Sequence, residues 1–162
     1  MKPAIIFFVL LLAGTLKADP SWRLLDGKIA SFDAPESLQR ITNRFGIDSE
    51  IEFYESKELS FAFDLGARSI SADLQTKIQK SISELEKHGK DEWKKSIYVD
   101  GGGSIHCDDD PKRDSERRYY LYLGFATGDP LGSFSIHIRM TSINQMNDVL
   151  RILRSIKIKP RK

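Results

Sequence analysis

Two runs of alternating polar and apolar residues constrain the fold of this chain most strongly. The runs are "EIEFYES" at 50–56 and "ELSFAFDLG" at 58–66. Alternation with a period of two residues is typical of a β-strand with one buried face. The polar turn at Ser56–Lys57 is too short for anything but a hairpin, so the two strands are predicted to be antiparallel neighbours. In the second strand, Leu59, Phe61 and Phe63 are expected to share the buried face.

Two other segments change to a helical period. Residues 72–88 carry apolar side chains three or four positions apart, and Gly89 fits the position after the helix end. Residues 143–155 come directly after Ser142, the first residue of "SINQ", whose serine and glutamine form a capping-box pattern. The apolar stripe of each predicted helix is expected to pack into the core: Leu74, Ile78, Ile82 and Leu85 in the first, and Met146, Val149, Leu150 and Leu153 in the second.

The remaining apolar segments are predicted strands. "KIASFDAPESL" indicates a short strand followed by a turn or a helix start near Pro35, and "SIYVDGGGSIHC" indicates a strand interrupted by its glycines. "RRYYLYLGFA" and "GSFSIHIRM" flank the turn "TGDPLG", and "SIKIK" is expected to close the domain as a short strand. We therefore predict an α+β fold in which an antiparallel sheet of about five to seven strands packs with two main helices. An α/β/α sandwich is the alternative arrangement of the same elements.

The first residues have the layout of a secretory signal peptide. Lys2 precedes an apolar run from Ala4 to Ala13, which is short for a membrane span. We predict cleavage after Ala18, a single α+β domain over 19–162, and no stable membrane span in the mature chain. An uncleaved anchor is the alternative. Thr15 stands where a lipoprotein would have its cysteine, so we expect a secreted or periplasmic protein without a lipid anchor.

The charge balance argues against a nucleic-acid partner. The chain has 25 basic and 23 acidic residues, and loss of Lys2 and Lys17 leaves equal numbers of each, whereas nucleic-acid binders usually carry a basic excess. Basic residues gather after Asp148, which predicts a solvated helix face and tail, with attraction to an anionic surface as the alternative. Cys107 is the only cysteine, so it is either buried or able to form an intermolecular bridge.

The order of these elements resembles a known superfamily. An opening "FDAP", a hairpin, a central helix, a "VDG" strand and a closing "ILRSIKI" are similar to PsbP-like/DcrB-like domains, which are secreted or lumenal. The resemblance spans most of 28–158 and implies an accessory or binding role. That superfamily has no shared catalytic set, so no functional residue is carried over. Its helices cover both faces of the sheet, whereas several strands here have one polar face.

The stretch "DGGGSIHCDDDPKRD", residues 100–114, combines residue types found in phosphate loops and metal sites. A phosphate loop is excluded because its glycines are followed by a lysine and a Ser/Thr that begin a helix. Here the glycines are followed by strand-like residues instead. His106 and Asp108 would share one side of a strand, which makes a weak divalent metal site conceivable. A solvated loop without metal is the interpretation we favour, and no cofactor is predicted. A metal-assisted hydrolase using these two residues is the alternative function.

The last two long strands point to a different surface. If Ala126 pairs with Ser133, Tyr122 lies opposite His137 and Tyr120 opposite Arg139, all on the polar face. Aromatic rings beside an imidazole and a guanidinium can stack on a ligand and hydrogen-bond it. Ordinary cross-strand pairing, partly covered by a helix or the N-terminal segment, is the alternative. The same alternation places Tyr54 and Asp64 on this face.

The sequence contains no positive indication of catalysis. "GGGSI" lacks the second glycine of a nucleophile elbow, and no carboxylate pair suggests an acid and base. We therefore favour a non-enzymatic role: an exported accessory or ligand- or protein-binding domain of the cell envelope or secreted fraction. Its partner would be an envelope protein or a small ligand.

Overall fold

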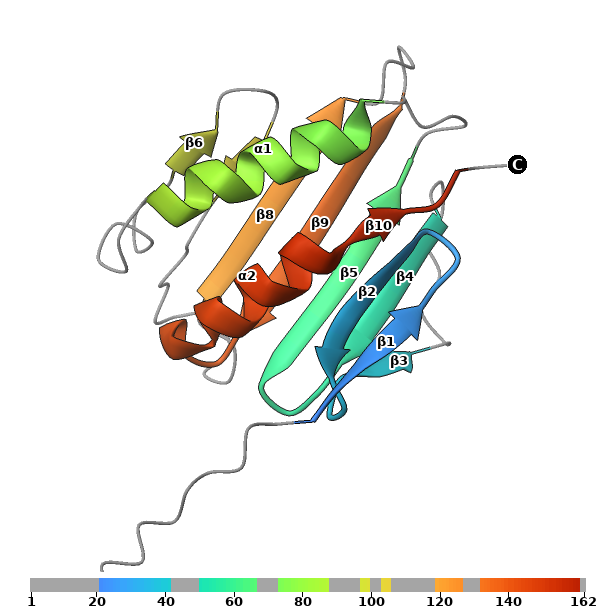
Figure 1. Ribbon diagram of the computed structural model, residues 1–162, viewed down its shortest axis with the longest axis vertical. Helices are drawn as coiled ribbons and strands as arrows, with labels where there is room; N and C mark the ends of the chain where they lie inside the picture. Colours follow the sequence, from blue (N-terminus) through green and yellow to red (C-terminus); the bar gives the residue numbers. More distant parts are fainter. Residues whose placement is uncertain are drawn as a thin grey trace, which may run out of the picture.

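A five-stranded antiparallel sheet forms the centre of the molecule (Figure 1). The computed structural model describes residues 21–41, 50–66, 73–87, 97–99, 103–105, 119–126 and 132–160. The strand order in this main sheet is β3-β4-β5-β9-β8. Its strands are β3 (Gln39–Ile41), β4 (Glu50–Glu55), β5 (Leu59–Leu65), β8 (Tyr119–Ala126) and β9 (Ser133–Met140). All four pairings are antiparallel, and the tight turn between β4 and β5 permits no other arrangement of that pair.

The predicted hairpin over 50–66 is confirmed. β4 pairs with β5 from Glu50↔Leu65 to Glu55↔Ser60. The turn is closed by Ser56, whose backbone N–H donates to the Leu59 carbonyl at 2.8 Å and whose hydroxyl accepts from the Leu59 N–H at 3.0 Å. Leu59, Phe61 and Phe63 are buried, as their alternation predicts.

Two smaller sheets accompany the main one. The order β1-β2-β10 joins β1 (Trp22–Asp26) and β2 (Ala30–Pro35) to β10 (Lys157–Ile158) from the far end of the chain. The sequence did not indicate β1, and the chain after β2 makes a turn into β3, so the alternative of a helix start near Pro35 is wrong. The glycine-containing segment forms two paired strands, β6 (Ile97–Val99) and β7 (Gly103–Ile105).

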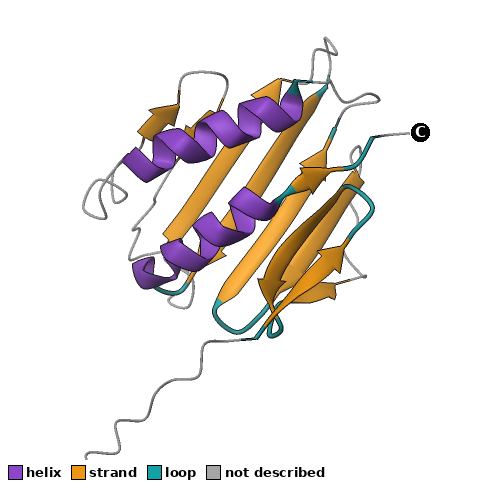
Figure 2. Cartoon of the chain, in the orientation of Figure 1, coloured by secondary structure: helices purple, strands orange, loops and turns teal. Residues whose placement is uncertain are grey.

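Both helices lie on the same face of the main sheet, together with β1, β2 and β10 (Figures 1 and 2). They are α1 (Leu74–Lys87) and α2 (Met146–Ser155), and α2 follows a short 3-10 turn, η2 (Ile143–Gln145). The α+β class and both helices are confirmed, but the described helices do not form the two outer layers of an α/β/α sandwich. Within the described ranges, neither helix is long and apolar enough to cross a membrane.

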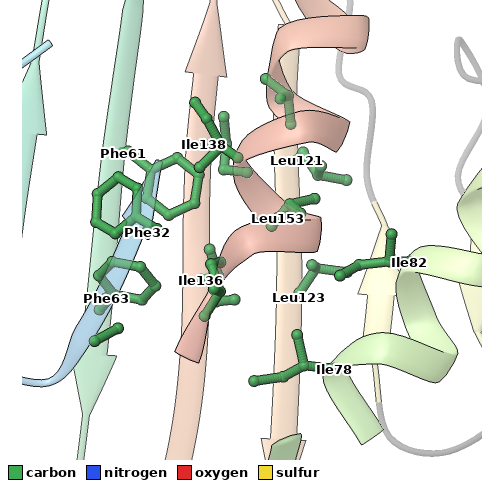
Figure 3. Packing of buried hydrophobic residues seen from close by; sticks show 14 of the residues in the cluster. Phe32, Phe61, Phe63, Ile78, Ile82, Leu121, Leu123, Ile136, Ile138 and Leu153 are labelled. Atoms are coloured by element: carbon green, nitrogen blue, oxygen red, sulfur yellow. The ribbon is translucent and has the colours of Figure 1, made fainter. Parts of the chain in front are cut away.

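The core fills the space between the main sheet and these covering elements (Figure 3). Phe32 of β2 inserts its ring against Phe61 and Phe63 of β5, with ring centroids 5.5 and 5.4 Å apart. Leu153 of α2 and Ile82 of α1 extend this core over the strands of the sheet. The small sheet is therefore a third covering element beside the two helices, and it contributes an aromatic ring to the same core.

The start of the second helix uses the predicted capping box. The Asn144 N–H donates to the Ser142 hydroxyl at 3.3 Å, and the Ser142 N–H donates to the Gln145 side-chain oxygen at 3.2 Å. Each bond satisfies a backbone donor that the start of a helix leaves without a partner.

Replacing Ser142 with alanine should lower the free energy of unfolding by about 1 kcal/mol, because one of these donors loses its acceptor. Urea denaturation of the two proteins measures the difference. Ser83→Ala is the matched control, since Ser83 is an exposed serine inside α1 where alanine is a better helix former. Equal midpoints for Ser142→Ala and the wild-type chain would contradict the role of the cap.

The basic residues near the C-terminus contact neighbouring elements. The Arg154 guanidinium pairs with Glu86 of α1 at 2.5 Å, and the Lys159 ammonium pairs with Asp26 of β1 at 2.6 Å. The Arg151 guanidinium lies 3.8 Å from the centroid of the Trp22 ring. These contacts connect the closing segment to α1 and β1, so three of the basic residues serve within the domain.

Candidate functional site

The predicted pairing of the last two long strands is confirmed. Ala126 pairs with Ser133, Tyr122 with His137, and Tyr120 with Arg139. β9 also pairs with β5, which places Asp64 opposite Ser135 and Ala62 opposite His137. Side chains alternate between the two faces of a strand, and the intervening residues Ile136 and Ile138 are buried in the core. The polar residues therefore lie on the face of the main sheet opposite the helices. We call Tyr120, Tyr122, Ser135, His137 and Arg139 the His137 face.

His137 is the centre of this face because both of its ring nitrogens have partners. Its Nδ1 lies 2.5 Å from the Tyr120 hydroxyl, and its Nε2 lies 2.8 Å from the Ser135 hydroxyl. The Tyr122 ring meets the imidazole edge-to-face, with centroids 4.9 Å apart. Alternation along the strand predicts Ser135 on this face, but Ser135 was not among the predicted ligand-binding residues, and it is only 7% exposed. The available signal was its position two residues before His137 on the same strand, since such residues share a face.

Arg139 is the exposed cation of the His137 face. Its guanidinium carbon lies 5.7 Å from the centroid of the Tyr120 ring, within the range of a cation–π contact. In the described part of the chain, no carboxylate forms an ion pair with Arg139. Asp64 lies on the same face but opposite Ser135, two residues along β9 from His137 in the other direction. The Asp64 row therefore carries a carboxylate, whereas the Arg139 row carries the guanidinium and, two strands away on β4, the carboxylate of Glu55.

Glycine at position 124 allows the second tyrosine to lie flat against the sheet. A Cβ atom at Gly124 would stand 2.7 Å from the Tyr122 hydroxyl and 2.8 Å from a carbon of its ring. Such contacts are too short, so any larger residue would displace the ring. A glycine within a strand commonly marks this kind of close approach.

Partial burial sets the protonation of the cluster. Burial lowers the pKa of His137 below its ordinary value of 6.5, and the Arg139 charge acts in the same direction, while Asp64 opposes both. Burial also raises the pKa of the Tyr120 hydroxyl, against the opposing effect of Arg139. At neutral pH the pair is therefore a neutral imidazole beside a neutral phenol, which can share one hydrogen bond with either group as the donor.

This pKa shift predicts a pH-dependent contribution to stability. Because the pKa of His137 is lower in the folded than in the unfolded chain, the unfolded chain binds more protons between the two values. The contribution is complete above about pH 6.5, the unfolded pKa, and is lost as the pH falls through the folded pKa. Denaturation of wild type and His137→Gln across this range measures it. Parallel pH profiles for the two proteins would contradict the prediction.

Of the two residues added to this face by alternation, Asp64 is placed correctly and Tyr54 is not. Tyr54 pairs with Phe61, so its side chain lies on the core face, where it is 2% exposed. Phe53 pairs with Ala62 and takes the opposite face instead. The error arises because β4 carries large apolar groups on both faces, so alternation alone does not show which face is buried.

A second polar cluster surrounds the buried carboxylate of Glu52. One oxygen accepts from the Lys28 N–H and the Arg40 guanidinium, both at 2.6 Å, and the other accepts from the Ile29 N–H at 2.9 Å. Burial, followed by the charge of Glu52, raises the pKa of the neighbouring Tyr54 hydroxyl. Sequence reasoning did not identify this cluster. Both carboxylate oxygens already bind the protein itself, so the cluster attaches the β1–β2 turn to the main sheet.

The predicted metal residues His106 and Asp108, like Cys107 and the signal segment 1–18, lie outside the described residues. The weak metal site and its hydrolase alternative therefore stay predictions. Where the structure is described, no three His, Cys, Asp or Glu side chains gather in a way that would hold a metal ion.

Comparison with protein-family models gives no match for this sequence. A search of curated proteins likewise finds no significantly similar sequence.

Proposed function

We propose that this chain is an exported accessory domain that binds a small ligand or a partner protein through the His137 face. The observation that carries the proposal is the exposed Arg139 guanidinium beside the Tyr120 ring, with Tyr122 and His137 in the next row, on the sheet face opposite the described helices. Arginine and tyrosine together are enriched where proteins recognise ligands and partners, since both combine a flat apolar surface with hydrogen-bond donors.

The supporting argument is that the face is ordered before any ligand arrives. Tyr120 and Ser135 hold the imidazole by both nitrogens, and Gly124 lets the Tyr122 ring lie against the strand. A site whose side chains are already fixed loses less conformational entropy on binding. If these residues served only as cross-strand pairs, each pair would contribute about 0.2–1 kcal/mol to the stability of the sheet. A binding role predicts in addition that their replacement abolishes the binding of a ligand, so experiment can separate the two roles.

We also propose that the chain is exported and that it is related to the superfamily that its element order resembles. We propose cleavage after Ala18, a secreted or periplasmic location, and membership in the PsbP-like/DcrB-like group of accessory domains. The intact mass of protein recovered from an exporting host tests the cleavage, because loss of residues 1–18 gives a defined mass. A full-length mass in that fraction would overturn it.

The binding role is tested by NMR with an isotope-labelled mature chain and a set of small aromatic compounds of different charge. We expect at least one compound to shift the amide signals of β8 and β9. Arg139→Gln should remove these shifts while changing the free energy of unfolding by no more than about 1 kcal/mol. Lys157→Gln, an exposed charge change on β10, is the matched control and should bind as wild type does. Shifts that map elsewhere, or shifts that survive Arg139→Gln, would contradict the site.

A further inference from the structure

We infer that the ligand group recognised at the His137 face is an anion, and that it binds more tightly when His137 is protonated. This inference rests on the proposed binding function and specifies the chemical class of its ligand. It depends on the hydrogen bonds that join Tyr120, His137 and Ser135 into one continuous chain through the imidazole, and on the Arg139 guanidinium beside the Tyr120 ring.

The anion end of the face is the row that contains Arg139 and Tyr120. These two residues pair directly across β9 and β8, and the Tyr120 hydroxyl reaches the His137 ring in the next row. Asp64 lies opposite Ser135 in the row beyond His137. Residues in alternate positions of a strand lie about 7 Å apart, so the Asp64 row is about 14 Å along the strand from the Arg139 row. An anion near Arg139 is thus far from Asp64, and the other described carboxylate of this face, Glu55 of β4, lies two strands away from Arg139 in the same row.

Counting hydrogens shows what the neutral imidazole offers. A neutral ring has one N–H and one bare nitrogen, so it donates to one of its two hydroxyl partners and accepts from the other. The hydroxyl that donates to the ring has used its hydrogen. Only one of Tyr120 and Ser135 therefore has a hydrogen left for a ligand, whichever tautomer is present.

Protonation changes this count. An imidazolium donates from both nitrogens, so Tyr120 and Ser135 both become acceptors toward the ring, and both keep their own hydrogens for a ligand. Whichever tautomer the neutral ring has, the protonated ring leaves the Tyr120 hydroxyl hydrogen free beside the Arg139 guanidinium, next to a new positive charge. Hydrogen bonds in which one partner is charged are shorter and stronger than neutral ones. The protonated face is therefore a better anion site by both charge and donor number.

The charged and titratable groups around His137 place the change on the pH scale. They are Asp64 of β5, Arg139 of β9, and Tyr120 and Tyr122 of β8. Burial and Arg139 lower the pKa of His137, while Asp64 opposes them. The affinity for an anion should therefore increase as the pH falls below about 6.5, through the pKa of His137, and level off beneath it.

The probe for this inference is benzenesulfonate, with benzenesulfonamide as its uncharged counterpart. A sulfonate stays ionised throughout the range from about pH 8 to about pH 4.5, so any change in affinity comes from the protein. NMR titrations of the mature chain at several pH values give the affinity and the protonation of the His137 ring in the same samples. We expect the affinity for benzenesulfonate to rise about tenfold, with a midpoint that coincides with the titration of His137. The sulfonamide should show no pH dependence.

Three variants separate the contributions. His137→Gln keeps an amide that can bond to both hydroxyls but does not titrate, so its affinity for benzenesulfonate should be the same at each pH. Tyr120→Phe removes the hydroxyl beside Arg139 whose hydrogen is free when the ring is protonated, and should reduce the pH dependence. Arg139→Gln should weaken binding at every pH, while Lys157→Gln should match wild type.

Failure of this inference can be distinguished from failure of the proposed function. A sulfonate affinity that is constant while His137 titrates would overturn the pH dependence and leave a binding face. Benzylammonium, a cation of similar size, is the third compound. Binding of the sulfonamide or benzylammonium without binding of the sulfonate would overturn the inference that the ligand is an anion, but not the binding function. If none of the three compounds shifts the signals of β8 and β9 at any pH, the anion inference and the small-ligand function are both wrong.

Discussion

Replacing Glu52 with alanine should lower the free energy of unfolding by about 3–5 kcal/mol. The side chain of Glu52 is 1% exposed, and its carboxylate accepts the N–H groups of Lys28 and Ile29 as well as the Arg40 guanidinium. Without the carboxylate, two backbone donors in the β1–β2 turn lose their acceptors, and an unsatisfied buried donor costs about 1–3 kcal/mol. Arg40 loses less, because its side chain is 40% exposed and can turn to water.

Urea denaturation of the mature chain measures this effect, with two variants as controls. Glu52→Gln keeps an acceptor oxygen of similar size, so it should fall between wild type and Glu52→Ala. Glu36→Ala removes an exposed carboxylate from the neighbouring turn and should change stability by less than about 0.5 kcal/mol. A loss of less than about 1 kcal/mol in Glu52→Ala would mean that the turn is held mainly by its apolar contacts.

Replacing Phe32 with alanine should also cost about 3–5 kcal/mol. The Phe32 ring is fully buried and contacts three other aromatic rings, those of Tyr54, Phe61 and Phe63, at centroid distances of 4.9 to 5.5 Å. Its removal leaves a cavity between the small sheet and the main sheet, where the surrounding strands can collapse only in part.

Denaturation and amide hydrogen exchange together test this prediction. Phe32→Leu refills most of the space and should recover a large part of the loss, whereas Leu24→Ala, at a position 65% exposed on β1, should cost little. Faster exchange should appear first in β1, β2 and β10, because Phe32 is the fully buried aromatic residue that joins their sheet to the core. Uniform acceleration across β5 and β9 as well would show that the small sheet does not open separately from the rest.

Several elements were predictable because their signals lie within a few neighbouring residues. The hairpin over 50–66, the helix around Leu74–Lys87 and the capping box at Ser142 each depend on local periods and turn chemistry. The pairing of Tyr122 with His137 was equally accessible, since a short connection leaves few registers that bury both apolar faces.

The candidate site was predictable as a set of residues but not as a network. Alternation brought Tyr120, His137 and Arg139 to one face, but it did not show that both nitrogens of His137 have protein partners. Those bonds depend on side-chain torsions and on the twist of the sheet, which no residue pattern records. These bonds show that His137 orients the Tyr120 hydroxyl, while its contact with a ligand stays a prediction.

The sequence by itself determined the α+β class, the two amphipathic helices and the polar face of β8 and β9, because hydrophobic periodicity encodes local conformation directly. The tertiary structure alone decided that Glu52 and Tyr54 lie inward while Phe53 lies outward, and that β10 completes a sheet with β2. These outcomes depend on partners far away along the chain. In the folded chain, the buried Glu52 carboxylate accepts hydrogen bonds from the N–H groups of a turn 23 to 24 residues away, and these bonds offset the cost of its burial.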